Sequence, residues 1–161
     1  MEIIIPQSLK SEHEVLRNML NYICHMPGKT GKTAKSIAAF IHSHFNKEEE
    51  YALPSLGLLP MLAESNVSIE MLPVIEMTDE LKLHLPEMLS EHEKIDKLLK
   101  NLIKASESEK HPEASIFARE LMLHAKTEEE VIYPAAILIG EHLKLMLGLN
   151  IKTENLLEII A

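Results

Sequence analysis

The chain has 161 residues, and a hydrophobic content of 46% is enough for one domain with a complete core. Its formal net charge of −9 argues against binding to nucleic acid, whose phosphates attract clustered lysine and arginine side chains. No run of residues approaches the ~20 apolar residues of a membrane span, and the first residues lack the basic segment of a signal peptide.

Two helices are predicted in the first third of the chain. Apolar residues recur at helical spacing over 7–23, directly after Pro6, and the stretch 27–31 ends this helix. The single cysteine, Cys24, cannot form an internal disulfide, which suits a cytoplasmic protein. The second helix is predicted to start near Lys32. One of its faces carries Ile37, Ile41, His44, Glu48 and Tyr51.

The middle of the chain is harder to interpret. Residues 55–78 are predicted to form short helices or an irregular connection, because Pro60 and Pro73 interrupt an apolar run. The third helix is predicted to contain Pro86 in its first turn and to end near Ala105. Its inward face is predicted to carry Met88, His92, Ile95 and Leu99.

The fourth helix is predicted to follow Pro112. Its inward face is predicted to carry Phe117, Leu121, His124, Glu128 and Val131. A last amphipathic helix over 153–160 could pack on the other helices or on a second copy of the chain in a homodimer. Helices joined by short turns predict an all-α fold, an up-down-up-down four-helix bundle with an additional C-terminal helix.

The two halves of the chain repeat the same short motifs. Ser-Glu-His-Glu occurs at 11–14 and again at 90–93, and each copy is followed by His-x-x-x-Glu-Glu-Glu, beginning at His44 and at His124. His44 and His124 lie 80 positions apart, close to the 79 positions between the two earlier histidines. The sequence therefore predicts a single domain over 1–161 with an internal duplication, roughly 7–56 and 86–136.

The duplication predicts a metal site made of four histidines and two glutamates. Residues four apart share one helix face, so the histidine and the first glutamate of each His-x-x-x-Glu motif converge. The predicted ligands are His13, His44, Glu48, His92, His124 and Glu128. Imidazole and carboxylate ligands suit iron, manganese or zinc. Two carboxylates among six ligands suggest two metal ions bridged by Glu48 and Glu128.

A simpler interpretation is that the histidines are hydrogen-bonded core residues and the glutamates a solvated helix face. The duplicated positions argue against it. Burying two unpaired carboxylates would cost several kcal/mol each, against a total stability of ~5–15 kcal/mol, and metal removes that cost. The neighbouring Glu49 and Glu129 could replace or assist Glu48 and Glu128, although the inward helix face favours the latter pair.

The ordered series His, His-x-x-x-Glu, His, His-x-x-x-Glu, over nearly all of residues 7–140, resembles the hemerythrin-like cation-binding domain. The resemblance implies a four-helix bundle around a non-haem di-iron centre bridged by two glutamates and an oxo or hydroxo group, with zinc or manganese as possible substitutes. Oxygen-carrying hemerythrins use a fifth histidine where this chain has Met88. The six-ligand set is more similar to the di-iron iron–sulfur-cluster repair proteins, whose cysteine-bearing N-terminal domain has no counterpart in these 161 residues.

The resemblance implies a protein that binds or reacts with dioxygen, nitric oxide or peroxide, in an oxidative or nitrosative stress response or as an iron donor. The alternative is a reversible oxygen-binding, oxygen-sensing or iron-storage protein without catalysis. Without a fifth imidazole the metals are less saturated, which favours redox chemistry over reversible carriage. Enzyme and binding protein both stay open at this point.

Overall fold

The computed structural model describes residues 3–149, which form helices and turns without a strand. The α-helices are α1 (Gln7–Cys24), α2 (Gly28–Lys47), α3 (Leu59–Ala63), α4 (Leu72–Glu109), α5 (Pro112–Thr127) and α6 (Tyr133–Met146). Shorter π and 3-10 turns occupy Glu48–Ala52, Leu53–Leu58, Ile69–Met71 and Glu128–Ile132. The prediction of an all-α bundle is confirmed.

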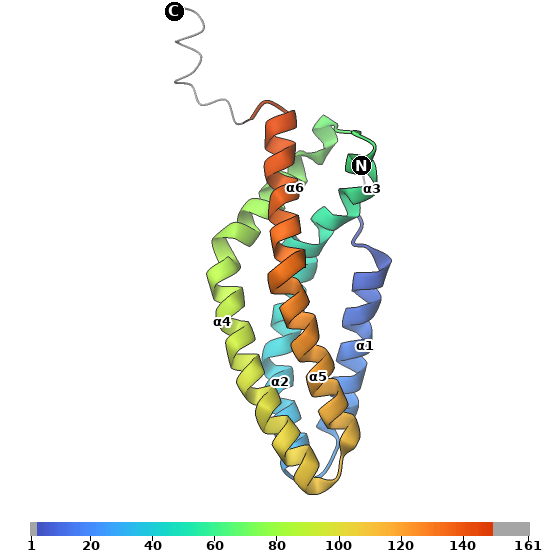
Figure 1. Cartoon of the computed structure of the whole chain (residues 1–161), viewed down its shortest axis with the longest axis vertical. Coiled ribbons are helices and arrows are strands. Elements are labelled where there is room, and N and C mark those ends of the chain that lie inside the picture. Colours follow the sequence, from blue (N-terminus) through green and yellow to red (C-terminus); the bar gives the residue numbers. More distant parts are fainter. Residues whose placement is uncertain (1–2, 150–161) are drawn as a thin grey trace, which may run out of the picture.

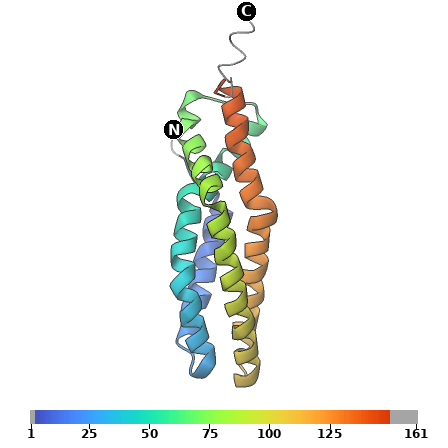
Figure 2. The same ribbon diagram turned by 90° about the vertical axis from the view of Figure 1, so that its left-hand side faces the viewer.

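The long helices lie side by side along one axis. The α1–α2 and α4–α5 connections lie at the same end of the molecule (Figure 1). α4 packs against both α2 and α5, and the view turned by 90° shows it between them (Figure 2). α6 continues the direction of α5 after one π-helical turn (Figure 1). This arrangement brings the inward faces of α1, α2, α4 and α5 toward one another.

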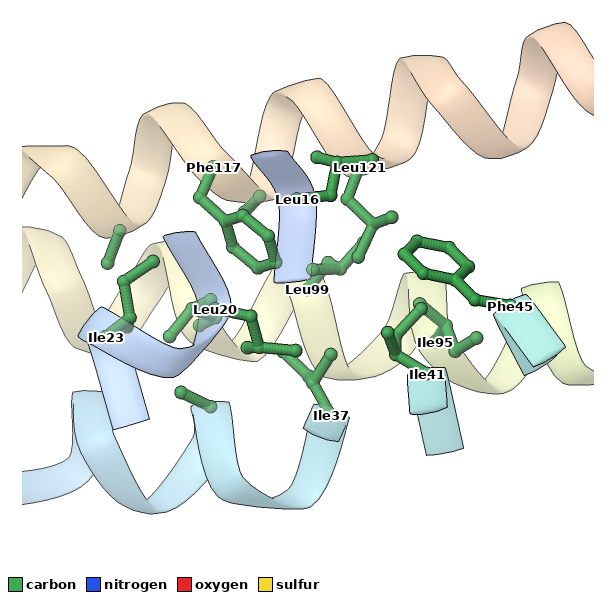
Figure 3. Packing of buried hydrophobic residues seen from close by; sticks show 14 residues of the cluster. Leu16, Leu20, Ile23, Ile37, Ile41, Phe45, Ile95, Leu99, Phe117 and Leu121 are labelled. Atoms are coloured by element: carbon green, nitrogen blue, oxygen red, sulfur yellow. The ribbon is translucent and has the colours of Figure 1, made fainter. Parts of the chain in front are cut away.

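Apolar side chains from these four helices fill the space between them (Figure 3). The buried set includes Leu16, Leu20, Ile23, Ile37, Ile41, Phe45, Ile95, Leu99, Phe117 and Leu121. Positions three or four apart on each helix contribute to it, which is the spacing that keeps one helical face turned toward the core. Phe45 directly follows one of the histidines described below, and Leu121 precedes another by three residues.

α2 begins at Gly28, four residues before the predicted start near Lys32. The Glu109 carboxylate, at the end of α4, accepts hydrogen bonds from the backbone N–H groups of Lys29 and Thr30 and from the Thr30 hydroxyl. These contacts satisfy donors that a helix start leaves free. Gly28 has a φ of +76°, and a Cβ there would lie 2.3 Å from a Glu109 oxygen. Gly28 thus allows α2 to start earlier than predicted, because it leaves room for the carboxylate of Glu109, which is distant in sequence.

α4 begins at Leu72 and contains Pro86 in its interior, so the prediction of a helix starting near Pro86 was wrong. Proline removes one backbone hydrogen bond and normally interrupts a helix. Here the additional turns pack against α6, and Val74 and Leu81 are fully buried. Burial of apolar side chains outweighs the local cost of the proline. The helix ends at Glu109, beyond the predicted end near Ala105.

No helix within residues 3–149 is long and apolar enough to cross a membrane. The amphipathic helix predicted over 153–160 lies outside the described residues.

Candidate metal centre

The six side chains predicted as metal ligands lie together between the helices, and all six are buried. They form two groups of four, and within each group the potential ligand atoms lie within 4.8 Å of one another. One group consists of His13, His124, Glu48 and Glu128, and the other of His44, His92 and the same two glutamates. Each group could hold a metal ion. Because Glu48 and Glu128 belong to both groups, their carboxylates could bridge two ions.

Each of the two glutamates is the first residue of a π-helical turn, over Glu48–Ala52 and over Glu128–Ile132. The preceding histidine stands one α-helical turn earlier, so both side chains point to the same side of the helix. A π turn contains an extra residue and often marks a functional site. The same change of winding in both halves of the chain places the two carboxylates alike.

Short distances join imidazole nitrogens to carboxylate oxygens. Nε2 of His124 lies 2.8 Å from Oε1 of Glu128, and Nε2 of His44 lies 3.2 Å from Oε1 of Glu48. His92 Nε2 is 3.4 Å from the other oxygen of Glu128. The Nε2 atoms of His44 and His92 approach to 2.7 Å. All these nitrogens therefore face one small volume that also contains both carboxylates.

Several of these buried polar atoms have no hydrogen-bond partner. They are Nε2 of His13, Nε2 of His124, Oε2 of Glu48 and both carboxylate oxygens of Glu128. The close contact between His124 and Glu128 lacks the direction that a hydrogen bond requires. Unsatisfied buried polar atoms are costly, and cations bound in the two groups would give these atoms partners. The donor set therefore fits a metal centre better than a hydrogen-bonded core.

The opposite nitrogen of each histidine faces a second carboxylate. Three Nδ1 atoms form hydrogen bonds with carboxylates: His13 with Glu49 at 2.9 Å, His44 with Glu91 at 2.7 Å, and His92 with Glu129 at 2.9 Å. The fourth, Nδ1 of His124, lies 3.2 Å from the carboxylate of Glu12. Such partners hold Nδ1 protonated, orient the ring and leave Nε2 free for a metal. We name Glu12, Glu49, Glu91 and Glu129 the outer carboxylates.

For two of the outer carboxylates, Glu49 and Glu129, the sequence had left open that they could replace or assist the central glutamates. The structure places them behind the histidines, outside both groups of potential ligands. Glu12 and Glu91 were not predicted at all. The duplication carried a signal, because these two glutamates occupy equivalent positions immediately before the first histidine of each half.

The buried charges shift one another's ionisation. Burial and the like charge of Glu128 raise the pKa of Glu48. Burial opposes the charge of Glu128, but contacts with the surrounding imidazoles outweigh it and hold its pKa well below the usual value. For His44 and His124 burial favours the neutral ring, but the neighbouring glutamates prevail and raise each pKa to about 9. Without metal, protons on these rings would balance the carboxylates.

We expect the stability of the metal-free protein to fall as the pH rises from about 6.5 to about 9. The folded-state pKa values of His44 and His124 lie near 9, above the ordinary histidine pKa of 6.5. Their contribution is therefore complete below the unfolded pKa and is lost as the pH passes through the folded pKa. Urea denaturation of chelator-treated protein at pH 6.5 and pH 9.5 measures the change. An equal or higher urea midpoint at pH 9.5 would contradict it.

Tyr133 is a further residue at the centre that was not predicted. Its side chain is 1% exposed, and its hydroxyl donates a hydrogen bond to Oε1 of Glu48. The tyrosine oxygen also lies 3.4 Å from Nε2 of His92. Its ring stacks on that of His92, with centroids 5.9 Å apart. Burial raises the pKa of this phenol, and the negative charges of Glu48 and Glu128 raise it further. The hydroxyl therefore stays protonated.

Tyr133 was missed because the prediction continued a regular helix past Glu128. That extrapolation placed Val131 on the inward face, but Val131 is 56% exposed. The π-helical turn shifts the helical phase, so Tyr133 points inward instead. Met88, which stands at the position of the fifth hemerythrin histidine, is fully buried in a cluster with Tyr133. The space beside His92 is therefore occupied by the ring of Tyr133, which follows the second His-x-x-x-Glu motif.

A family model described as "Hemerythrin HHE cation binding domain" matches residues 5–136 of the chain. This range contains all six predicted ligands and the whole of α1, α2, α4 and α5. No curated protein and no solved structure matches the chain.

Proposed function

This chain belongs to the family of hemerythrin HHE cation-binding domains, and we propose that it holds two bridged iron ions that bind or react with dioxygen, nitric oxide or peroxide. The proposed ligands are His13, His44, Glu48, His92, His124 and Glu128. The proposal includes a single domain formed by duplication and an up-down-up-down order of helices. The two helical connections at one end of the bundle support that order (Figure 1).

One observation carries the proposal: two groups of potential ligands share the same two buried carboxylates. A single-metal site would leave two histidines without a role, whereas two ions use all six side chains. Imidazole and carboxylate donors suit iron, and zinc or manganese could substitute for it. An oxo or hydroxo group would be the third bridge.

The chain's own groups would prepare the centre in three ways. The outer carboxylates fix each imidazole with its Nε2 directed inward. The Tyr133 hydroxyl holds one oxygen of Glu48 by donating a hydrogen bond to it. Phe45, stacked on His13 with centroids 4.0 Å apart, closes one side against water. The bound iron ions would supply electrons and coordination positions for a small oxidant.

We expect iron-loaded protein to contain two iron ions per chain, because only two ions satisfy both groups of ligands. Anaerobic loading, removal of loosely bound metal and elemental analysis with protein quantification provide the measurement. Zinc analysis is needed in parallel, since zinc binds such ligands at least as tightly as ferrous iron. A limit of one ion per chain, with iron and zinc counted together, would rule out the two-metal centre.

A role in the response to oxidative or nitrosative stress, or in iron donation, is part of the proposal. Stopped-flow mixing of the reduced protein with dioxygen tests it against the alternative. Rapid oxidation without a lasting adduct supports redox chemistry. A persistent adduct that disappears when oxygen is removed would identify a reversible oxygen-binding or oxygen-sensing protein.

A further inference from the structure

We propose that a neutral diatomic gas reaches the centre beside His13 and His124, whereas the position beside His44 and His92 is closed. This inference rests on the proposed two-iron function and assigns different roles to the two halves of the duplicated centre. The sequence motifs make the halves look equivalent, but residues around them differ.

A small cavity touches the centre on the His13–His124 side. It has a volume of about 20 Å³ and is lined by His13, His124 and Glu128 together with apolar residues that include Leu9, Leu53 and Ile132. A volume of this size accommodates about one water-sized molecule. The cavity therefore adjoins potential ligands of one group and offers room for a very small ligand.

A surface groove between α1 and α5 provides a route to this cavity. The groove has a volume of about 540 Å³, and it shares Glu12, His124 and Thr127 with the cavity lining. Only these side chains are common to both spaces. The carboxylate of Glu12 is 48% exposed and contacts Nδ1 of His124. A small movement of this side chain would connect groove and cavity.

Tyr133 and Leu53 account for the difference deep in the centre. They occupy equivalent positions, each five residues after its central glutamate and 80 positions apart in the chain. Tyr133 fills the space beside His92 and is hydrogen-bonded to Glu48. Leu53 is equally buried, but its shorter side chain lines the cavity beside His13 and His124. The tyrosine closes one metal position, and the leucine leaves the other accessible.

Lys47 and Thr127 repeat the same difference nearer the surface. They are also 80 positions apart, each one residue before its central glutamate. The ammonium group of Lys47 lies 2.7 Å from Glu87 and 2.8 Å from Glu91, the outer carboxylate that contacts His44. Lys47 thus covers Glu91, and the Glu91 side chain is only 20% exposed. Thr127 is shorter and lines the opening beside Glu12.

A second groove, between α4 and α5, approaches the other side of the centre but does not enter it. It has a volume of about 400 Å³ and reaches His92 and the outer carboxylate Glu129. Neither central glutamate lines it, and Glu129 occupies the Nδ1 side of His92. The groove thus ends behind an imidazole.

The cavity lining identifies the chemical class of the ligand. Leu9, Leu53 and Ile132 offer an anion neither a charge nor a hydrogen bond, and the Glu12 carboxylate at the entrance repels one. A neutral diatomic molecule, such as nitric oxide or dioxygen, needs no compensating charge and is small enough after slight movement of the side chains. Nitric oxide is the more convenient probe, because its complex with ferrous iron has an optical and a paramagnetic signature.

Anaerobic titration of the reduced, iron-loaded protein with nitric oxide tests the proposal. We expect one nitric oxide per chain. The Leu53→Tyr variant gives the first half of the chain the residue that closes the metal position in the second. It should weaken binding roughly tenfold or more, because the larger side chain fills the space that the gas would occupy. Tyr133→Leu should open the second position and raise the stoichiometry to two. The combined exchange should return it to one.

Matched variants separate closure from general damage. Tyr133→Phe keeps the ring and removes only the hydroxyl, so its stoichiometry should stay at one. Leu56→Tyr enlarges another buried leucine of the same segment that does not line the cavity, and its affinity for nitric oxide should stay at the unmodified value. If Leu53→Tyr does not fold, Leu53→Phe is the milder substitution with which to test the route. The number of nitric oxide molecules bound by Tyr133→Leu tests the closure of the second position independently of Leu53.

Two results overturn the assignment: two nitric oxide molecules bound by the unmodified chain, or one bound by Tyr133→Leu when iron content is unchanged. An affinity unaffected by either Leu53 substitution overturns the proposed route. The iron content of each variant is measured first. If the unmodified protein holds two irons per chain but the nitric oxide stoichiometries differ from those expected, only the asymmetry is refuted. If it holds fewer than two irons per chain, the proposed function and this inference are refuted together.

Discussion

We expect the Glu48→Gln variant to lose both iron ions, from two per chain to nearly none. Glu48 belongs to both groups of potential ligands, so one substitution removes a donor and a negative charge from each metal position. The amide oxygen can still accept the Tyr133 hydrogen bond, which keeps the packing close to the original. Elemental analysis after anaerobic loading, at several free iron concentrations, measures the effect.

The same variant should lose the stabilisation that iron provides. Metal that binds only the folded protein adds about 2.7 kcal/mol at a free concentration one hundred times the dissociation constant. Without metal, Glu48→Gln should be at least as stable as the original chain. Burial and the like charge of Glu128 raise the pKa of Glu48, so its negative charge is unfavourable in the folded state. Denaturation with and without iron separates these two effects.

Glu50→Gln is the matched control for Glu48→Gln. Glu50 lies in the same π-helical turn but is exposed, and it should keep both its iron content and its stability. If Glu50→Gln lost as much iron as Glu48→Gln, the central role of Glu48 would be wrong. Retention of two tightly bound ions by Glu48→Gln would lead to the same conclusion.

The second large effect is expected from an outer carboxylate. Glu91→Ala should lower the affinity for iron by roughly 10–100-fold, as is typical when the partner of a metal-binding histidine is removed. The substitution deletes the acceptor that holds His44 by Nδ1, while leaving all six proposed ligands in place. Competition with a chelator of known affinity measures the change, and saturating iron should still restore two ions per chain.

Glu93→Ala provides the control on the same helix. Glu93 lies two residues from Glu91, is exposed and belongs to neither group of potential ligands. Its affinity for iron should equal that of the unmodified protein. An equal loss from both substitutions would point to the negative charge of the surface rather than to the orientation of His44. Full affinity in Glu91→Ala would show that His44 needs no partner at Nδ1.

Much of the fold follows from local patterns in the sequence. The inward faces of α1, α2, α4 and α5 were predicted from apolar residues three and four positions apart, and these residues form the observed core. Apart from the outward-facing Val131, the errors lie at helix boundaries. The early start of α2 depends on Glu109, and the early start of α4 on packing against α6. Neither partner is near in sequence, so local propensity could not place these ends.

The duplicated motifs by themselves determined which six side chains converge, because a histidine and a glutamate four residues apart share one face wherever the helix forms. Only the tertiary structure decided what surrounds them. The π-helical turn that begins at Glu128 changes the helical phase and brings the Tyr133 hydroxyl to Glu48 in the first half of the chain. The outer carboxylates likewise reach their histidines from neighbouring helices. Periodicity describes one helix, whereas these contacts depend on how helices pack against one another.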